Sequence, residues 1–314
     1  MHRIIGKYQG PENSGPLLVV TAAVHGNEPA GVLALQSVFS MLEQQEPAFK
    51  GTLVGVVGNL QAYQQKMRFI DRDLNRAWIP EQIQRILHAN PEHLAAEDRE
   101  IKSLIQLFHE LLETYRPEAM VLLDLHTTSA DGGIFCIPSD DKAALRLAKA
   151  LHAPVILQFF EGIEGPLLRY AVDGHFNYTA YAPKTIGVAF EAGQHEDPDS
   201  VQRAIAVIIH CLRATGCIED DALPNPQEKI LDAYSQALPK VTRLCYAHRI
   251  RPGDAFRMRP GYSNFQVIQD GEHLADDVCG PIRADQNGLI LMPLYQAKGS
   301  EGFFVVEEVY PDLG

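Results

Sequence analysis

The chain has 314 residues, of which only five are cysteine, and it contains no long hydrophobic run. The cysteines are scattered and form no Cys-x-x-Cys pair, which argues against a disulfide framework and against a zinc site built from thiolates. The apolar run Leu17–Val24 is far shorter than a membrane span, and the N-terminal residues carry no stretch typical of a signal peptide. We therefore expect a soluble cytoplasmic protein without a membrane partner.

Basic residues are scarce relative to acidic ones. The 27 Lys and Arg residues are outnumbered by 40 Asp and Glu residues, so the formal net charge is -13. A field of this sign repels nucleic-acid phosphates and anionic lipids, and we expect no nucleic-acid partner. Hydrophobic residues make up 46% of the chain, which is ordinary for a globular protein. The composition leaves open whether the chain forms a homo-oligomer.

Apolar segments typical of buried strands alternate with helical patterns along the first two thirds of the chain. The strands are expected at residues 17–24, 52–59, 120–125, 155–159 and 185–190, and the helices at residues 30–46, 95–115, 142–151 and 200–214. This alternation predicts an α/β fold with a mainly parallel sheet flanked by helices.

Beyond Gly216 the pattern changes. Residues 219–226 are acidic and contain two prolines, and short β-like segments follow at 241–248, 264–269, 288–294 and 302–309. We expect an α/β domain at residues 1–220, followed at residues 221–314 by a linker and a smaller C-terminal β-rich domain.

A histidine and a glutamate lie close together after the first expected strand. The motif His25-Gly-Asn-Glu28 puts an imidazole and a carboxylate three residues apart, and Pro29 then favours the start of a helix. Open α/β sheets bind their ligands at this carboxyl edge. The spacing alone is a weak signal, because a chain with 12 histidines and 40 acidic residues contains such pairs by chance, as in His273-Leu-Ala-Asp276.

A second expected strand, at residues 120–125, runs directly into His126. A catalytic zinc takes three protein ligands and leaves one position open, and His126 is the natural third candidate beside His25 and Glu28. Asp124 lies two residues earlier, so its side chain shares a strand face with His126. That carboxylate is suited either to orient an imidazole or to a structural role.

Two further segments carry residues suited to hydrolysis. Glu191 follows the strand expected at residues 185–190, at the same edge of the sheet, where it can exchange a proton with water and with a leaving nitrogen. Residues 67–78 interleave charges with single apolar side chains, a pattern that is also typical of a solvated loop. Within them, Asn75-Arg76 can grip a carboxylate and Arg68 can stabilise an oxyanion.

Together these segments resemble the succinylglutamate desuccinylase and aspartoacylase family, which is related to the zinc carboxypeptidases. The resemblance covers about Leu17 to Leu212, extends more weakly into the C-terminal part, and is closer to the aspartoacylase branch. It rests, in order, on the motifs His25-Gly-Asn-Glu28, Asp73-Leu-Asn-Arg76, Asp124-Leu-His126 and Glu191-Ala-Gly193. It implies a zinc carboxypeptidase-like fold in which the C-terminal β domain caps the site.

The resemblance also implies a role for each residue of the metal site. It assigns one Zn2+ per chain to the ligands His25, Glu28 and His126. It makes Glu191 the general base and acid, and it makes Arg68 the residue that polarises the scissile carbonyl.

For substrate binding, the resemblance implies that Asn75-Arg76 holds the α-carboxylate and that Tyr295 reaches the site from the C-terminal domain. One position departs from the family pattern. Tyr181 stands where aspartoacylases place an arginine that binds the side-chain carboxylate of N-acetylaspartate, so we do not expect a strong preference for that substrate. Lys184 or Arg169 is close enough in sequence to supply the missing cation.

The implied function is a zinc-dependent amidohydrolase that cleaves a small anionic N-acyl amino acid to a carboxylate and a free amino acid. One alternative is a zinc carboxypeptidase acting on peptides, which is favoured if the C-terminal domain leaves an open groove. Another is a binding protein of the same fold without turnover, although a pure binder has no need of Glu191. The sequence identifies neither the acyl group nor the amino acid.

Overall fold

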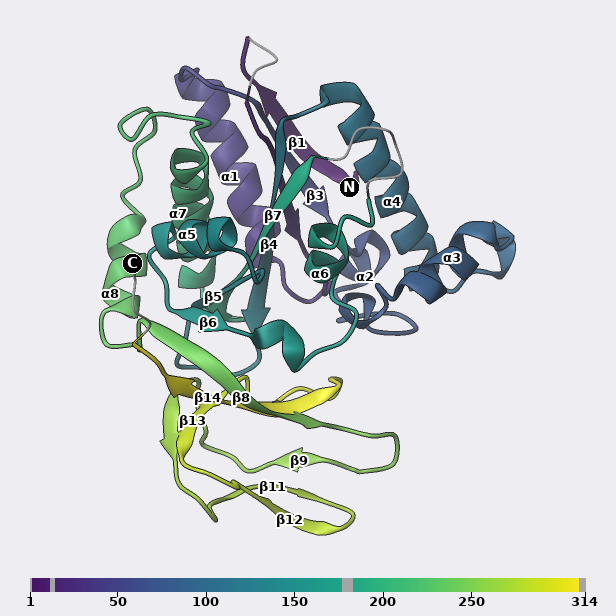
Figure 1. Cartoon of the computed structure of the whole chain (residues 1–314), viewed down its shortest axis with the longest axis vertical. Coiled ribbons are helices and arrows are strands. Elements are labelled where there is room, and N and C mark those ends of the chain that lie inside the picture. The colour runs from purple at the N-terminus through teal and green to yellow at the C-terminus, as the bar shows by residue number, and fades with distance from the viewer. Residues whose placement is uncertain (1, 12–14, 177–182, 311–314) are drawn as a thin grey trace.

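The computed structural model describes residues 2–11, 15–176 and 183–310. These residues form an α/β fold around one large mixed sheet, in the order β1-β3-β2-β4-β7-β5-β6-β8-β14-β13-β10 (Figure 1). The strands from the first two thirds of the chain are β1 (Ile4–Gln9), β2 (Leu17–Ala22), β3 (Thr52–Val57), β4 (Ala119–Thr128), β5 (Phe135–Pro138), β6 (Val155–Leu157) and β7 (Lys184–Gln194). The neighbours β3, β2, β4 and β7 run parallel, as the sequence predicts for the centre of the sheet.

Helices cover both faces of this sheet. The helices that pack on one face are α1 (Ala30–Gln45), α5 (Lys142–Ala150), α7 (Asp199–Ala214) and α8 (Glu228–Ser235). Those on the other face are α3 (Pro80–His88), α4 (Ala96–Tyr115) and α6 (Leu167–Val172). The short elements are α2 (Leu60–Gln65) and the 3-10 turns η1 (Leu74–Arg76), η2 (Pro91–His93) and η3 (Phe159–Glu161).

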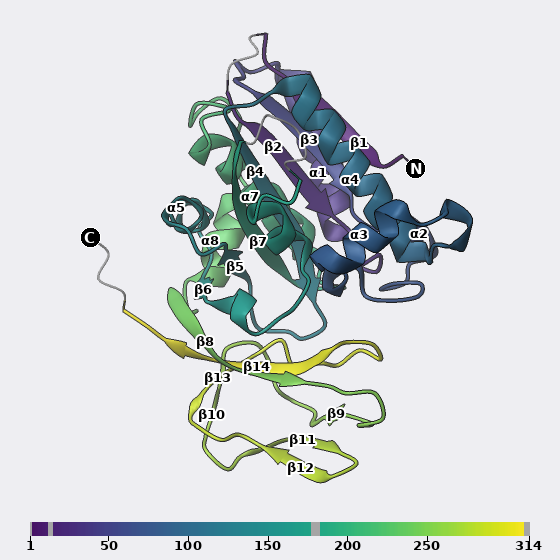
Figure 2. The same ribbon diagram turned by 45° about the vertical axis from the view of Figure 1, so that its right-hand side comes forward.

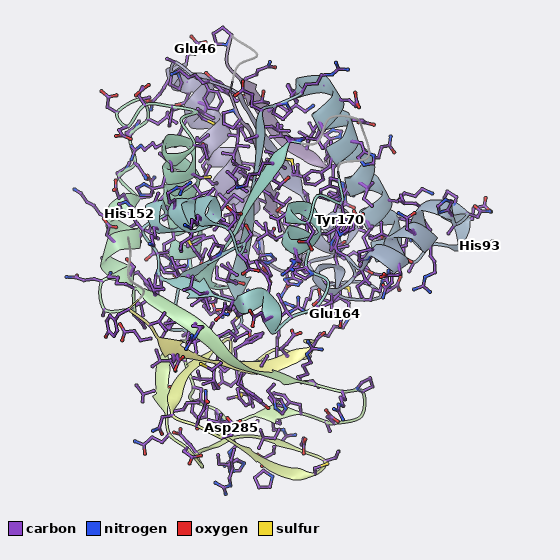
Figure 3. The ribbon with its side chains drawn as sticks, in the orientation of Figure 1. Glu46, His93, His152, Glu164, Tyr170 and Asp285 are labelled. Atoms are coloured by element: carbon purple, nitrogen blue, oxygen red, sulfur yellow. The ribbon has the colours of Figure 1, made fainter. Side chains whose placement is uncertain are left out.

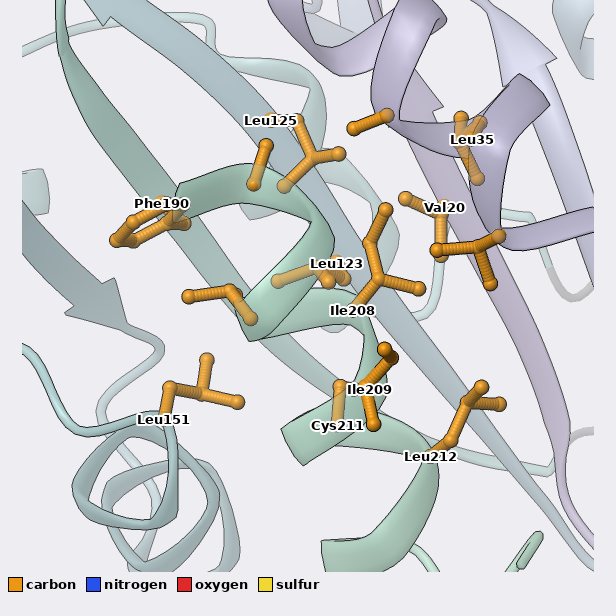
Figure 4. Close-up of a cluster of buried hydrophobic side chains, with 14 of the residues drawn as sticks. Val20, Leu35, Leu123, Leu125, Leu151, Phe190, Ile208, Ile209, Cys211 and Leu212 are labelled. Atoms are coloured by element: carbon orange, nitrogen blue, oxygen red, sulfur yellow. The ribbon is translucent and has the colours of Figure 1, made fainter. Parts of the chain in front are cut away.

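Alternation along the strands decides which side chains each face receives. Figure 4 shows Val20 and Leu123 of the sheet packed between Leu35 of α1 and Ile208 of α7. On β4 the even-numbered residues, beginning with Met120, point instead to the face covered by α4 and α6. Asp124 and His126, near the end of β4, therefore lie on the α4 and α6 side.

Among the described residues up to position 220, two strands were not expected from the sequence. The strand β5 runs antiparallel to β7, so the sheet is mixed beyond its parallel centre. With four residues, β5 is too short to show a periodic pattern. The strand β1 pairs only with β3 at the sheet edge, where its partly exposed sequence carries no clear alternation.

The C-terminal part continues the large sheet. Its strands β8 (Val241–Arg249), β10 (Gln266–Ile268), β13 (Gly288–Leu291) and β14 (Glu301–Glu308) join through the parallel pair β6–β8. Three more strands, β9 (Arg257–Met258), β11 (His273–Asp277) and β12 (Gly280–Arg283), form a smaller antiparallel sheet (Figure 2). The pair His273 and Asp276 lies here, where the two side chains contact each other 2.8 Å apart in β11.

None of the helices in the described residues is long and apolar enough to cross a membrane. Three cysteines are buried, two are exposed, and all are free thiols. The cytoplasmic location, the lack of membrane and nucleic-acid partners, and the domain boundary at residue 220 remain predictions from the sequence.

Candidate active site

The ends of β2 and β4 bring three candidate metal ligands together. His25 follows β2, Glu28 precedes α1, and His126 lies near the end of β4. Their side chains are buried, and one ligand atom of each lies within 4.8 Å of the others. The Nδ1 atoms of His25 and His126 lie 2.8 Å and 3.1 Å from the two carboxylate oxygens of Glu28.

A tight backbone turn holds His25 and Glu28 in place. The Glu28 N–H donates to the carbonyl of His25 over 3.1 Å. Between them, Gly26 lies so close to α2 that a Cβ atom would stand 2.2 Å from the carbonyl carbon of Ala62, so only glycine fits. Glu28 also accepts the Thr127 N–H over 3.1 Å, which ties this turn to β4.

Each candidate histidine has a carboxylate at its second ring nitrogen. His25 Nε2 lies 3.2 Å from Asp73, and His126 Nε2 lies 3.0 Å from Asp124. Thr21 in turn donates to Asp124 over 2.5 Å. Carboxylates in this position keep the proton on Nε2 and leave Nδ1 available to a metal ion. The residues thus fit a zinc ion, and Asp124 serves to orient an imidazole.

Charges within this cluster shift the pKa values of its members. Burial by itself would raise the pKa of Glu28, but the nearby His25 and His126 hold it well below its usual value. Burial would lower the pKa of His126, but Asp124 and Glu28 raise it well above the usual value. Protons therefore compete with a metal ion for this cluster, because a histidine must be neutral to act as a ligand.

Glu191 lies on β7 directly opposite His126 in the strand register. The strands β4 and β7 continue past both residues, so Glu191 is within a strand and not after its end as expected. Burial is the main reason that the pKa of Glu191 rises to about 7, with Glu28 raising it further and His126 opposing the shift. Its Oε2 atom is buried and has no hydrogen-bond partner among the described residues. This oxygen is free to accept a proton.

The segment that carries Arg68 is held by a residue that the sequence analysis missed. Glu97, on the first turn of α4, is fully buried and accepts the backbone N–H groups of residues 70, 71 and 72. The held segment places Arg68 with Nη2 3.1 Å from Asp73 and Nη1 3.6 Å from Glu28. An acidic residue on the buried face of an expected helix was the available signal for Glu97.

Asn75 and Arg76 both line the cavity that contains the three candidate ligands. The Asn75 side-chain oxygen accepts the Leu167 N–H over 2.9 Å. Arg76 is paired within the chain, because its Nε and Nη2 atoms donate to the two carboxylate oxygens of Glu301 over 3.0 Å and 2.6 Å. The expected clamp for a substrate carboxylate therefore already holds a carboxylate from β14.

Of the two expected tyrosines, the described residues include Tyr295, which is not among the residues that line this cavity. The Tyr295 hydroxyl donates to the carbonyl of Arg259 over 2.9 Å and accepts the Tyr262 N–H over 2.8 Å, so it is held within the C-terminal part. Its neighbour Gln296 lines the cavity instead. Tyr181 lies outside the described residues.

A second group of candidate ligands lies between the turn after α5 and the helices α7 and α8. His210 Nε2 and His152 Nδ1 lie 3.7 Å and 3.8 Å from the same carboxylate oxygen of Glu228. The two imidazole rings stack with their centroids 4.2 Å apart. Figure 3 shows His152 at the surface beside α8, away from α6 with its labelled Tyr170.

Comparisons with known proteins identify the family to which this chain is related. A family model described as the succinylglutamate desuccinylase/aspartoacylase catalytic domain matches residues 14–215. Over 121 residues the chain is 29% identical to a protein of a Nostoc species named probable aspartoacylase, with 38% of each chain covered. Over 120 residues it is 28% identical to succinylglutamate desuccinylase of a Shewanella species, covering 37% of this chain and 33% of that one. The matches thus span little more than a third of these relatives.

The fold is similar to those of solved structures over nearly the whole chain. A succinylglutamate desuccinylase/aspartoacylase from Rhodobacter sphaeroides has a TM-score of 0.65 at 17% identity, covering 98% of this chain and 88% of that one. The ectoine utilization protein EutE (DoeB) from Ruegeria pomeroyi has a TM-score of 0.63 at 17% identity, covering 96% and 87%. Since the family model matches more than half of the residues, the chain belongs to the succinylglutamate desuccinylase/aspartoacylase family.

Proposed function

We propose that this chain is a zinc-dependent hydrolase that cleaves the linear amide bond of an N-acyl amino acid. The observation that carries the proposal is the arrangement at one sheet edge. Two buried imidazoles and a carboxylate face one point, and Glu191 lies beside them with a buried oxygen that no described residue binds. Imidazole nitrogen and carboxylate oxygen suit zinc, and three such ligands leave a position open.

The chain's own residues supply the remaining chemistry. A zinc ion at this site would polarise the amide carbonyl and activate the attacking water. Glu191 takes the proton of that water, since a pKa of about 7 makes it a stronger base than an exposed glutamate. It then returns the proton to the amide nitrogen, so that the C–N bond breaks and a neutral amine leaves. Arg68 lines the same cavity and stabilises the negative charge that develops on the carbonyl oxygen.

The C-terminal part supports a small substrate over a peptide. Its side chains that line the cavity include Met292, Leu294, Gln296, Glu301 and Phe304. A carboxypeptidase acting on peptides needs an open groove for the chain that precedes the scissile bond, which makes it the less favoured alternative. A binding protein without turnover is less favoured too. Burying the unpartnered Glu191 oxygen costs folding free energy, and a protein that only binds its ligand would gain no catalysis in return.

Amine release from purified protein tests the proposal. The protein is stripped with a chelator, reloaded with zinc, and offered N-acetyl, N-formyl and N-succinyl amino acids beside a blocked dipeptide with a free C-terminus. We expect amine release from at least one N-acyl amino acid, dependent on zinc and faster than peptide cleavage. Release from the dipeptide alone would favour the carboxypeptidase, and no release from any compound by zinc-loaded protein would contradict the proposal.

A further inference from the structure

The cavity that holds the candidate metal ligands has two chemically different ends. Glu191, Arg68 and the metal ligands form a polar end. The other end is apolar, and its walls include Ile137, Phe159, Phe160, Ile163, Leu168 and Phe304. Apart from Ile163, these apolar side chains come from four separate elements of the chain, namely β5, η3, α6 and β14.

The strand register places the apolar end directly beside Glu191. Ala189 lies two residues before Glu191 on β7 and therefore faces the same side of the sheet. Its antiparallel partner on β5 is Ile137, which also lines the cavity, so apolar side chains begin two residues from Glu191 along β7. The Phe159 and Phe304 rings also line the cavity and pack with their centroids 4.7 Å apart. A group attached to an amide at Glu191 therefore meets an apolar surface.

The cations that line the cavity are already paired. Among the described residues, Arg68 and Arg76 are the Lys and Arg side chains in its walls. Arg68 contacts Asp73 over 3.1 Å, and Arg76 makes its two-pronged pair with Glu301. The charge of Glu301 also raises the pKa of Arg76, although burial opposes that shift. Each guanidinium group in the cavity walls is therefore already paired with a carboxylate of the chain.

The basic residues expected as substitutes for a binding arginine lie elsewhere. Lys184 and Arg169 line a separate cavity. Lys184 contacts Asp141 over 3.6 Å, and Arg169 donates to Asp173 over 3.0 Å. The residues outside the described ranges, at positions 1, 12–14, 177–182 and 311–314, include no Lys or Arg in the sequence. A second substrate carboxylate therefore finds no unpaired guanidinium or ammonium group here.

We propose that the cavity accepts an apolar group beside the scissile amide, so that the enzyme prefers apolar N-acyl amino acids over N-acylated aspartate and glutamate. This inference rests on the proposed function and narrows its substrate class. A carboxylate placed against the apolar walls would lose its hydration without gaining a partner there. Glu301 is thus a specificity-determining residue, because its negative charge offsets that of Arg76 and so disfavours a ligand with two carboxylates more than a ligand with one.

Binding to a variant that cannot turn over its ligand tests the inference directly. Zinc-loaded Glu191→Gln protein is titrated in a calorimeter with N-acetyl-L-leucine, N-hexanoylglycine and N-acetyl-L-aspartate. We expect at least one of the two apolar compounds to bind at least about 10-fold more tightly than N-acetyl-L-aspartate. Tighter binding of N-acetyl-L-leucine would place the apolar group on the amino acid. Tighter binding of N-hexanoylglycine would place it on the acyl part. Tighter binding of N-acetyl-L-aspartate than of both apolar compounds overturns the inference.

A pair of matched variants on β14 tests the role of Glu301. Glu301→Gln removes one negative charge from the cavity, which should favour N-acetyl-L-aspartate, with two carboxylates, over N-acetyl-L-leucine, with one. We expect the ratio of their kcat/KM values to rise by about 10-fold. Glu307→Gln removes the same charge from the same strand, but its partner Arg243 is exposed outside the cavity, so the ratio should stay unchanged. An equal ratio in both variants overturns the specificity role.

A second substitution keeps the test independent of Glu301. Ile163 is only half-buried in the cavity wall, so Ile163→Lys places a cation at the apolar end with little risk to folding. In this variant the Kd of N-acetyl-L-aspartate should fall relative to the Kd of N-acetyl-L-leucine. Wild-type protein that releases amine from no N-acyl compound, but still binds the apolar ligands more tightly, would show that the proposed hydrolysis is wrong. The inferred ligand class would then stand.

Discussion

Two groups in this molecule offer the same ligand types, two histidines and one glutamate, in different surroundings. In the group of His25, Glu28 and His126, all three side chains are buried. In the group of His152, His210 and Glu228, the His152 side chain is 42% exposed and the two rings stack on each other. Ligand type and spacing alone therefore do not separate a catalytic centre from a surface cluster.

The surroundings of the ring nitrogens make the difference. Asp73 and Asp124 face the second nitrogens of the first pair of histidines. In the second group, His210 Nε2 is buried without a hydrogen-bond partner in the described part of the chain, and Arg213 lies 3.9 Å from Glu228. A metal ion would meet an opposing cation there. The first group also has Glu191 beside it, which a hydrolase needs and a surface cluster lacks.

The sharpest test of this comparison is metal content after loss of one histidine from each group. His126→Ala should reduce bound zinc from one ion per chain to nearly none and remove hydrolysis, because it deletes a ligand. The matched variant His210→Ala should keep both. Elemental analysis of dialysed protein checks this, and two zinc ions in wild-type protein, or full occupancy in His126→Ala, would break the comparison.

The next largest effect is expected at the base. Glu191→Gln keeps the shape of the side chain but cannot accept a proton, so kcat should fall roughly 10²-fold or more. Zinc content should stay unchanged, since Glu191 is not a ligand in this assignment. Steady-state kinetics combined with metal analysis measures both quantities. Turnover like that of wild type would place the base at another residue.

Loss of an orienting carboxylate should have a smaller effect on metal binding. Asp124→Asn replaces the charged acceptor at His126 Nε2 with a neutral amide and should weaken zinc affinity by about 10 to 100-fold. The control is Asp232→Asn, which removes the carboxylate 3.2 Å from His152 Nδ1 and should leave zinc affinity as it is. Competition with a coloured chelator gives both affinities, and equal losses in the two variants would contradict the assignment.

The smallest expected effect is on the pH dependence of stability. Burial is the main reason that the pKa of His210 falls to about 4, with His152 and Arg213 adding to the shift. Between this value and the usual 6.5 the unfolded chain binds more protons than the folded one, so this part of the stability is present above pH 6.5 and is lost as the pH falls towards 4.

The variant His210→Gln removes that proton difference. Its Tm should therefore fall less than that of wild type when the pH is lowered from 6.5 to 4.5, by about 2 °C or more. Thermal unfolding followed by circular dichroism at both pH values measures the difference. Parallel curves for the two proteins would show that His210 does not carry it.

Much of the fold and of the candidate metal site was predictable, because apolar periodicity and motifs are read from short stretches of sequence. Strand and helix patterns follow from apolar periodicity, which is why the parallel centre of the sheet was expected from residues 17–24, 52–59, 120–125 and 185–190. Parallel strands bring their carboxyl ends to one edge, so His25, Glu28 and His126 were expected together.

The sequence by itself determined the candidate ligands, the candidate base and the α/β architecture, since each depends on a residue type and its place on a strand. Only the tertiary structure decided the surroundings of those residues. Glu97 of α4 accepts a hydrogen bond from the segment that carries Arg68, and Glu301 contacts Arg76 although 225 positions separate them in the chain. The apolar end likewise exists only where β5, η3, α6 and β14 meet. Such contacts depend on packing between distant elements, which no local pattern records.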